Sequence, residues 1–304
     1  MTVFPLISAS DLAQVIANPD RAYVIVDCRF RLEDRDYGEG AHYESHIPGA
    51  MYLSLECDLA ARRSPDGYGG RHPLPTIEVM EETFSYLGIE RGVTDVFIYD
   101  DSRFAFAARL WWMLRYCGHD RVFILDGGWP GWVAAGLPVT SDTPLSQLIG
   151  AKTPPFVAQV KPHWIVDHAQ VLAVSESASI PVSKVAIVDS RSPERYRGEV
   201  EPIDPYAGHI PGAIVRFWQG VTDDAGYARS PEEQWQRWHD IAGIDRAIVY
   251  CGSGVTACVN LLSIELARHH DPSFSIVSQL YTGSWSDWCA YITEIDDPRI
   301  ARAP

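Results

Sequence analysis

A chain of 304 residues is long enough for two domains of ordinary size, and its 46% hydrophobic and 21% charged residues are typical of a globular protein. Its formal net charge of −15 argues against nucleic acids and anionic membranes as partners, because both would repel it. No apolar run approaches the roughly 18 residues of a membrane span, and no charged segment followed by an apolar run opens the chain. We therefore expect a cytoplasmic protein that attracts any anionic substrate through local positive charge.

The first half of the chain predicts alternating helices and strands. Residues 10–17 begin with Ser10, which suits a helix cap, and Tyr23–Arg29 is an apolar strand that ends in polar residues. The pentapeptide His46–Ala50, with the sequence His-Ile-Pro-Gly-Ala, follows after a charged loop. The later elements are a strand, a helix, a short strand and a segment with two tryptophans, at Val96–Ser102, Phe104–Tyr116, Arg121–Leu125 and Gly127–Trp132.

The second half repeats these landmarks in the same order. The matching segments are Ala186–Arg191, the second His-Ile-Pro-Gly-Ala at His209–Ala213, Ala247–Ser253, Val255–Arg268, Phe274–Val277 and Gly283–Trp288. Matched landmarks in one order indicate a duplicated domain of about 150 residues. We predict an α/β fold of two tandem domains, each a parallel β-sheet with helices on both faces. The expected bounds are 1–140 and 161–304, joined by a linker at 141–160 that is rich in Pro, Ser and Thr.

The most informative stretch surrounds Cys251. Ala247–Tyr250 has strand character and leads into Cys251, a loop with two glycines and a helix, which is typical of a βα turn at the carboxyl end of a parallel strand. The N–H groups of such a loop and the positive end of the helix dipole stabilise anions, so they favour the thiolate form of a cysteine. Cys251 is therefore the candidate nucleophile. The alternative is a small buried hydrophobic residue.

The heptapeptide Cys251–Ala257 resembles the active-site loop of the tandem-domain rhodanese-like sulfurtransferases, in particular those of the 3-mercaptopyruvate type. Cysteine-based phosphatases build a similar loop but close it with an arginine, and none lies between Cys251 and Arg268. The resemblance implies two rhodanese domains, of which only the second carries the cysteine. Asp100 takes the matching position in the first, and a carboxylate cannot accept sulfane sulfur.

The resemblance also implies residues that bind or activate the substrate. Ser253 aligns with a serine that takes part in activating the substrate, and a simple turn residue is the alternative. Arg195 aligns with a substrate-binding arginine, and a guanidinium captures a carboxylate well. The family's second arginine has no counterpart in Glu199–Asp204. The remaining candidates are the loop residues Gly252, Gly254, Val255 and Thr256, of which Thr256 would also suit a helix cap, and Arg197, for which a solvated surface position is the alternative.

Two histidine segments are harder to interpret. The family places the histidine that matches His46 in a relay with a serine and an acidic residue, for which Asp36 is the candidate. Because the same motif recurs at His209 in the domain with the cysteine, a structural role is the alternative. The loop Gly67–Leu74 would supply Arg71 or His72 if it lay at the active site. Buried ion pairs within Asp27–Arg29 and Asp189–Arg191, and core packing of the four repeated tryptophans, are expected to be structural.

The expected function is sulfur transfer without a metal or organic cofactor, since the six cysteines lack the spacing of metal ligands. The Cys251 thiolate would take sulfur from a small anionic donor as a persulfide and pass it to cyanide or to a thiol, including that of a thioredoxin-like protein. Because Gly252 and Ser253 are neutral, we expect 3-mercaptopyruvate to be preferred over the thiosulfate dianion. The alternatives are a thiosulfate sulfurtransferase with the same mechanism and a non-catalytic persulfide carrier. We also expect that Asp100→Cys creates no second site, because the first loop lacks glycines.

Overall fold

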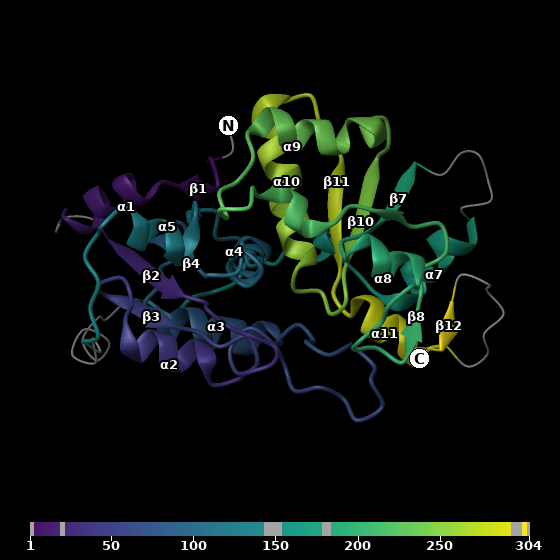
Figure 1. Cartoon of the computed structure of the whole chain (residues 1–304), viewed down its shortest axis with the longest axis horizontal. Helices are drawn as coiled ribbons and strands as arrows, with labels where there is room; N and C mark the ends of the chain where they lie inside the picture. The colour runs from purple at the N-terminus through teal and green to yellow at the C-terminus, as the bar shows by residue number, and fades with distance from the viewer. Residues whose placement is uncertain (1–2, 19–21, 143–153, 178–183, 293–299, 303–304) are drawn as a thin grey trace. The chain divides into compact units, whose positions relative to one another are not determined.

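The computed structural model describes residues 3–18, 22–142, 154–177, 184–292 and 300–302 (Figure 1). Most of the predicted linker, 143–153, lies outside these residues. The chain forms two compact units. Unit 1 consists of Met1–Ala61, Pro75–Lys161 and Thr222–Ala228, and unit 2 consists of Arg62–Leu74, Pro162–Val221 and Arg229–Pro304. Each unit thus includes one short segment from the opposite half of the sequence, while the contiguous domain bounds stay a prediction.

Unit 1 is built on a five-stranded parallel sheet with the order β1-β5-β4-β2-β3. Its strands are β1 (Leu6–Ile7), β2 (Tyr23–Asp27), β3 (Ala50–Tyr52), β4 (Asp95–Tyr99) and β5 (Val122–Leu125). Its helices are α1 (Ala9–Ile16), α2 (Tyr37–Glu44), α3 (Ile77–Tyr86), α4 (Ala107–Tyr116) and α5 (Gly128–Ala134). The middle strand, β4, is buried along its whole length, as expected for a parallel sheet covered on both faces.

Unit 2 repeats this topology with the strand order β6-β11-β10-β7-β9. The strands are β6 (Ile165–Val166), β7 (Val185–Asp189), β9 (Ile214–Val215), β10 (Arg246–Tyr250) and β11 (Val277–Tyr281), and a separate antiparallel pair joins β8 (Tyr206–Ala207) to β12 (Ala301–Arg302). The helices are α7 (His168–Ser177), α8 (Pro193–Arg197), α9 (Pro231–Trp238), α10 (Ala257–His270) and α11 (Ser284–Ala290), with 3-10 turns η1 (Pro162–Trp164), η2 (Trp218–Val221) and η3 (His239–Ile241). The identical order confirms the predicted duplication and the α/β fold class.

The middle strand of the unit 2 sheet, β10, positions the candidate site. It is hydrogen-bonded to β11 on one side and to β7 on the other, and α10 packs against both β10 and β11. Ala247, Ile248, Val249 and Tyr250 are all buried, because the strand has no face toward solvent. The carboxyl end of β10 therefore holds the next residue, Cys251, in a rigid frame.

The predicted ion pairs are present in both units. Nη2 of Arg29 lies 2.6 Å from the Asp27 carboxylate, and Nη2 of Arg191 lies 2.7 Å from that of Asp189. All four side chains are almost completely buried. Each carboxylate ends its strand and accepts the main-chain N–H of its arginine, so the pair fixes the chain where it leaves the sheet.

The four repeated tryptophans pack largely as predicted. Trp132, Trp285 and Trp288 are buried on the short helices α5 and α11, and Trp129 is half-buried. Trp129 lies under the guanidinium of Arg29, with 4.5 Å between the guanidinium carbon and the ring. These indoles therefore serve the core and the buried ion pairs.

Two local predictions are wrong. The strand predicted at the apolar stretch 274–277 instead lies at Val277–Tyr281, as β11. The N–H of Phe274 instead bonds to the Asp271 carbonyl in a turn, while Ser278 and Gln279 lie within the strand because their backbone pairs with β10. The first helix is capped by Ser8, whose hydroxyl accepts the N–H of Asp11, and not by Ser10. Among the described residues, no helix has the length and apolar character needed to cross a membrane.

Candidate active site

Cys251 follows β10 directly and is only 2% exposed. Its N–H donates to the Ser284 hydroxyl (3.2 Å), and its carbonyl accepts the N–H of Trp285 (3.0 Å). Ser284 adopts a positive φ of 56°, a conformation that is costly for a residue with a side chain. Its hydroxyl also donates to the Tyr281 carbonyl (2.8 Å), so two hydrogen bonds hold this serine in place. The start of α11 thus fixes the backbone of the candidate nucleophile.

The loop after Cys251 is buried and closely packed. Gly254 has a φ of +76°, and a Cβ atom there would collide with the Thr282 carbonyl, so the position requires glycine. Val255 is buried, and Thr256 is the N-cap residue of α10 without a side-chain cap bond. The helix then begins at Ala257, two residues later than the predicted Val255.

The Ser253 hydroxyl is paired with a histidine. Oγ of Ser253 lies 2.8 Å from Nδ1 of His72, and both residues are 7% exposed. His72 belongs to the segment 62–74, whose residues are part of unit 2. The sequence identified this loop as a source of His72 but did not assign it to the serine. No feature of the sequence alone could have paired residues so far apart in the chain.

Two guanidinium groups approach the same loop at Gly252. A Cβ atom at position 252 would lie 2.8 Å from Nη2 of Arg71, 3.6 Å from Nη1 of Arg195 and 3.7 Å from Nη2 of Arg195. Arg195 therefore lies beside the loop, as predicted, although its predicted role is untested. Arg71 comes from the segment 62–74. The loop residues Gly252 and Ser253 are neutral, but these two guanidinium groups bring positive charge to the loop from outside it.

Acidic residues hold both arginines. Arg195 donates from Nε to Glu201 (3.1 Å) and from Nη2 to Glu201 (2.6 Å) and Asp204 (3.2 Å), and Nη1 of Arg71 donates to Asp204. Burial raises the pKa of Asp204, and the neighbouring Arg71 guanidinium opposes that rise. Opposite charges thus alternate along one line of ion pairs that consists of Asp189, Arg191, Glu201, Arg195, Asp204 and Arg71.

The remaining predicted residues make other contacts within their own units. Arg197 is exposed and pairs with Glu199 (2.6 Å), in line with a solvated surface position. His46 and Asp36 belong to unit 1, where Asp36 is exposed at the start of α2 and His46 is buried. Nδ1 of His46 lies 2.6 Å from the carbonyl of His42, and burial lowers the pKa of His46. The relay predicted for His46 and Asp36 stays a prediction.

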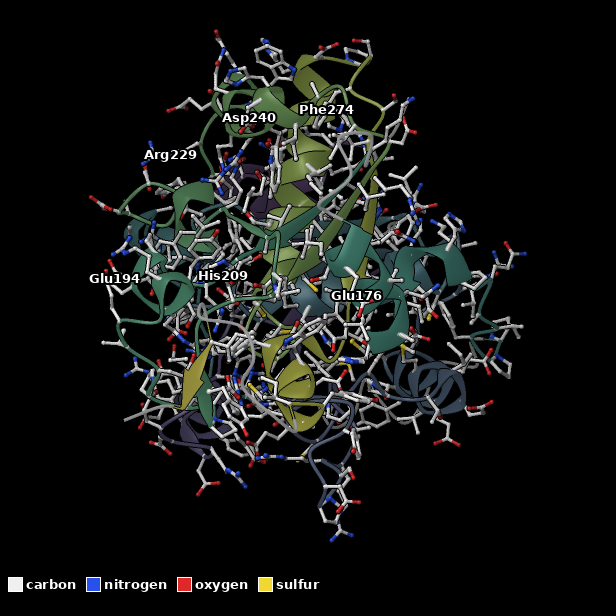
Figure 2. All side chains as sticks on the ribbon, turned by 90° about the vertical axis from the view of Figure 1, so that its right-hand side faces the viewer. Glu176, Glu194, His209, Arg229, Asp240 and Phe274 are labelled. Carbon is white, nitrogen blue, oxygen red and sulfur yellow. The ribbon has the colours of Figure 1, made fainter. Side chains whose placement is uncertain are left out.

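The second His-Ile-Pro-Gly motif has the same kind of contact. Nδ1 of His209 bonds to the carbonyl of Tyr196 on α8 (2.7 Å), and the two rings stack with 3.9 Å between their centroids. Figure 2 shows His209 beside the helix that carries Glu194. In both units the histidine ties the motif to a neighbouring helix, which favours a structural role for it.

Burial keeps other thiols in the neutral form. It raises the pKa of Cys28 and Cys289, and it raises the pKa of Cys117 to about 12. Because the thiolate is the nucleophilic form, these three cysteines are poor nucleophiles at neutral pH.

Comparison with known proteins agrees with this geometry. The model of the rhodanese-like domain matches residues 8–135 and again 176–291. The chain belongs to the rhodanese-like family. The protein named "Probable 3-mercaptopyruvate sulfurtransferase" of Pseudomonas aeruginosa is 39% identical over 98% of each chain, and "Putative thiosulfate sulfurtransferase SseB" of Mycobacterium tuberculosis is 35% identical over 93% of each.

A solved structure supports the same assignment. SseA from Escherichia coli, described as a 3-mercaptopyruvate sulfotransferase, superposes with a TM-score of 0.72 at 30% identity, covering 93% of this chain and 99% of that one. Each unit of the present chain is thus a rhodanese domain, and the protein is a sulfurtransferase.

The first rhodanese domain shows what the strand–loop–helix turn does to a side chain at its start. The Asp100 carboxylate accepts four main-chain N–H groups, those of Ser102 (2.9 Å), Phe104 (3.1 Å), Phe106 (2.9 Å) and Ala107 (2.9 Å). These N–H groups converge although the loop has no glycines, because Arg103 and Phe104 both adopt positive φ, 58° and 71°. The reason given for the Asp100→Cys expectation is therefore wrong. The convergence in this loop also supports the anion-stabilising role inferred for the loop at Cys251.

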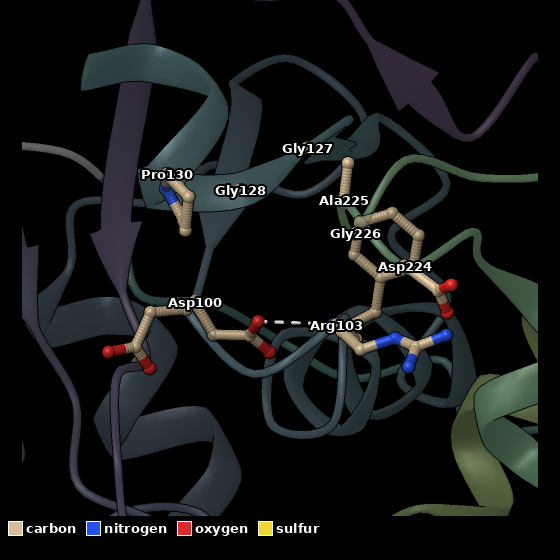
Figure 3. A pocket seen from close by; sticks show the side chains of 10 residues that line it. Asp100, Arg103, Gly127, Gly128, Pro130, Asp224, Ala225 and Gly226 are labelled. Atoms are coloured by element: carbon tan, nitrogen blue, oxygen red, sulfur yellow. Dashed lines mark hydrogen bonds between the residues drawn. The ribbon is translucent and has the colours of Figure 1, made fainter. Parts of the chain in front are cut away.

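The cavity above this loop has a volume of about 330 Å³ (Figure 3). Its lining includes the Asp100 carboxylate and two further acidic residues, Asp101 and Asp224. The described lining residues include one cation, Arg103, and its Nε donates to Thr222 (2.7 Å). An anionic sulfur donor would therefore meet repulsion here, in contrast to the arginines beside Gly252.

We still expect that Asp100→Cys creates no second site for sulfur transfer, now for an electrostatic reason. The new thiol would meet the converging N–H groups, but the donor would have to approach Asp101 and Asp224. The variant is best made together with Cys251→Ser and incubated with donor, and its intact mass is then measured. The expected mass shows no added sulfur, and stoichiometric persulfide at position 100 would contradict the explanation.

Proposed function

We propose that this sulfurtransferase takes sulfur from 3-mercaptopyruvate as a persulfide on Cys251 and delivers it to a thiol or to cyanide. The observation that supports this most directly is the hydrogen bond of 2.8 Å between Ser253 and His72, two residues after the nucleophile. A hydroxyl bonded to an imidazole is a proton donor of the kind that departure of a carbon leaving group requires. The names of similar proteins agree with this choice of donor.

The proposed reaction begins with attack of the Cys251 thiolate on the sulfur of 3-mercaptopyruvate. A sulfur–sulfur bond forms, and the carbon–sulfur bond of the donor breaks, with its electron pair leaving on the enolate of pyruvate. The enolate carbon then takes up a proton and becomes pyruvate, and Ser253 with His72 would supply that proton. Arg195 would bind the donor carboxylate at its planar guanidinium.

The second half of the reaction regenerates the enzyme. An acceptor thiolate, or cyanide, attacks the outer sulfur of the persulfide, forms a new bond to it and returns Cys251 as thiolate. A thioredoxin-like protein is one such thiol. If Cys251 served as a carrier instead, the persulfide would form but small acceptors would not discharge it. The intact mass, measured after addition of the donor and again after addition of cyanide, distinguishes an enzyme from a carrier. We expect cyanide to restore the starting mass.

Thiosulfate is a second candidate donor, by the same mechanism. Because two guanidinium groups lie beside Gly252, the site suits a compact dianion better than the neutral loop residues alone would. One similar protein is also named for thiosulfate. With thiosulfate the leaving group is sulfite, which departs with its charge and needs no proton on carbon.

Steady-state kinetics with both donors tests the proposal. With cyanide as the common acceptor, we expect a higher kcat/KM for 3-mercaptopyruvate than for thiosulfate. In Arg195→Gln the value for 3-mercaptopyruvate should fall about ten- to a hundredfold, since a charge-assisted contact contributes roughly 1.5–3 kcal/mol. A wild-type preference for thiosulfate would reject 3-mercaptopyruvate as the main donor and leave the sulfurtransferase class unchanged.

A further inference from the structure

We propose that Arg71 supplies the second positive charge of the donor site and, with Arg195, selects anionic sulfur donors. The inference rests on the proposed function in that Cys251 is the atom to which the donor comes. It assigns a role to a residue of the segment 62–74, which lies far in the sequence from the loop that carries Cys251.

The position of the guanidinium carries the inference. Nη2 of Arg71 lies 2.8 Å from the site of a Cβ at residue 252, which is closer than either terminal nitrogen of Arg195. The two arginines therefore approach the residue that directly follows the nucleophile. Their side chains are 15% and 17% exposed, so both are shielded from bulk water yet accessible to a small solute. A partly buried positive charge at this depth acts more strongly on an anion than a surface charge does.

The backbone of the segment is fastened to the first turn of α11. The N–H of Gly69 donates to Oδ1 of Asp287 (2.7 Å), and the N–H of Arg71 donates to Oγ of Ser286 (3.1 Å). Gly70 has a φ of +82°, and a Cβ atom there would collide with the Gly283 carbonyl. Because α11 also anchors the backbone of Cys251, one short helix holds both the nucleophile and Arg71.

Asp204 orients the guanidinium of Arg71 but leaves one of its terminal nitrogens beside Gly252. Nη1 of Arg71 donates to Oδ1 of Asp204, while the other terminal nitrogen, Nη2, is the one beside Gly252. The carboxylate also accepts from Arg195, so it holds the two guanidinium groups together. An incoming carboxylate or sulfonate would use the remaining N–H donors of both arginines.

This arrangement also constrains position 252. A long basic side chain there, which we would otherwise expect to favour thiosulfate, would collide with Arg71 and add a third positive charge to the two present. The pair of arginines responds to negative charge rather than to one chemical group. The inferred donors are therefore small anions that carry a carboxylate or sulfonate close to the sulfur that is transferred.

The test compares two alkylating reagents that differ in charge. Iodoacetate and iodoacetamide both react with a thiolate and release iodide, but only iodoacetate is an anion. The ratio of their rate constants at Cys251, followed by mass spectrometry of the peptide that contains it, reports the positive charge near the sulfur. In Arg71→Gln this ratio should fall roughly three- to tenfold, the effect of one charge several ångströms away in a partly screened site. Arg71→Lys should keep most of it.

Two control variants separate charge from structure. Arg71→Lys keeps the positive charge but loses the planar guanidinium, so the ratio should fall much less than in Arg71→Gln. Arg63→Gln removes an exposed arginine from the same segment and should leave the ratio unchanged. An unchanged ratio in Arg71→Gln, or an equal fall in Arg63→Gln, would overturn the inference. Because alkylation needs no sulfur donor, this result stands whether or not 3-mercaptopyruvate proves to be the substrate.

Discussion

Replacing Cys251 by serine should reduce sulfur transfer by more than about a thousandfold while the protein remains folded. A serine hydroxyl is not ionised at neutral pH, and an alcohol oxygen on this loop cannot carry sulfane sulfur as a persulfide. The change in volume is small, and the hydrogen bonds that fix residue 251 come from its backbone N–H and carbonyl. The measurement is cyanide-dependent turnover with either donor, together with thermal unfolding of both proteins.

Cys57→Ser is the matched control, because Cys57 is an exposed cysteine in the other rhodanese domain. It should keep full activity. If Cys251→Ser retained a tenth of the wild-type rate, the persulfide mechanism at this residue would be wrong. If it lost activity but also unfolded at a much lower temperature, Cys251→Ala would show whether the loop itself tolerates the loss of sulfur.

Much of the fold could be predicted because the same elements recur in the same order in both halves of the chain. Asp27–Arg29 and Asp189–Arg191 recur at the ends of matching strands, and the same local physics buries both ion pairs. The sequence predicts β11 at the wrong place because periodicity favours the apolar residues 274–277, whereas pairing with β10 decides where the strand lies. Backbone pairing across a parallel sheet is non-local, and a single stretch of sequence does not contain it.

The residues of the candidate site that lie close together in the sequence can be predicted from it. Those that come from a distant segment cannot. Cys251, Ser253 and the loop glycines follow one strand, so their neighbourhood follows from the βα turn. His72 and Arg71 reach that loop from a segment that precedes it by some 180 residues, and the hydrogen bonds to α11 that bring them there have no sequence signature. The sequence fails to predict the convergence of N–H groups on Asp100 for a different reason. Glycine makes positive φ easy, but the loop holds Arg103 and Phe104 there as well.

Substitution of Ser253 or His72 should cause the second large loss of activity. Ser253→Ala and His72→Asn should each lower kcat with 3-mercaptopyruvate by roughly a hundred- to ten-thousandfold, the range of general acid catalysis. An asparagine amide can still bond to the Ser253 hydroxyl, but it cannot transfer a proton. Because the two side chains would act as one unit, the double variant should be little worse than either single variant.

Kinetics with thiosulfate distinguish a role of Ser253 and His72 in proton transfer from a role in positioning the loop. Sulfite leaves as an anion, so with this donor the same variants should lose less than about tenfold, a structural effect on the loop alone. The two donors are compared at one nucleophile because a displaced Cys251 would slow both reactions equally. Equal losses with both donors would show that Ser253 and His72 position the loop rather than move a proton. A large loss confined to 3-mercaptopyruvate would assign the proton of pyruvate to the hydroxyl that lies 2.8 Å from His72.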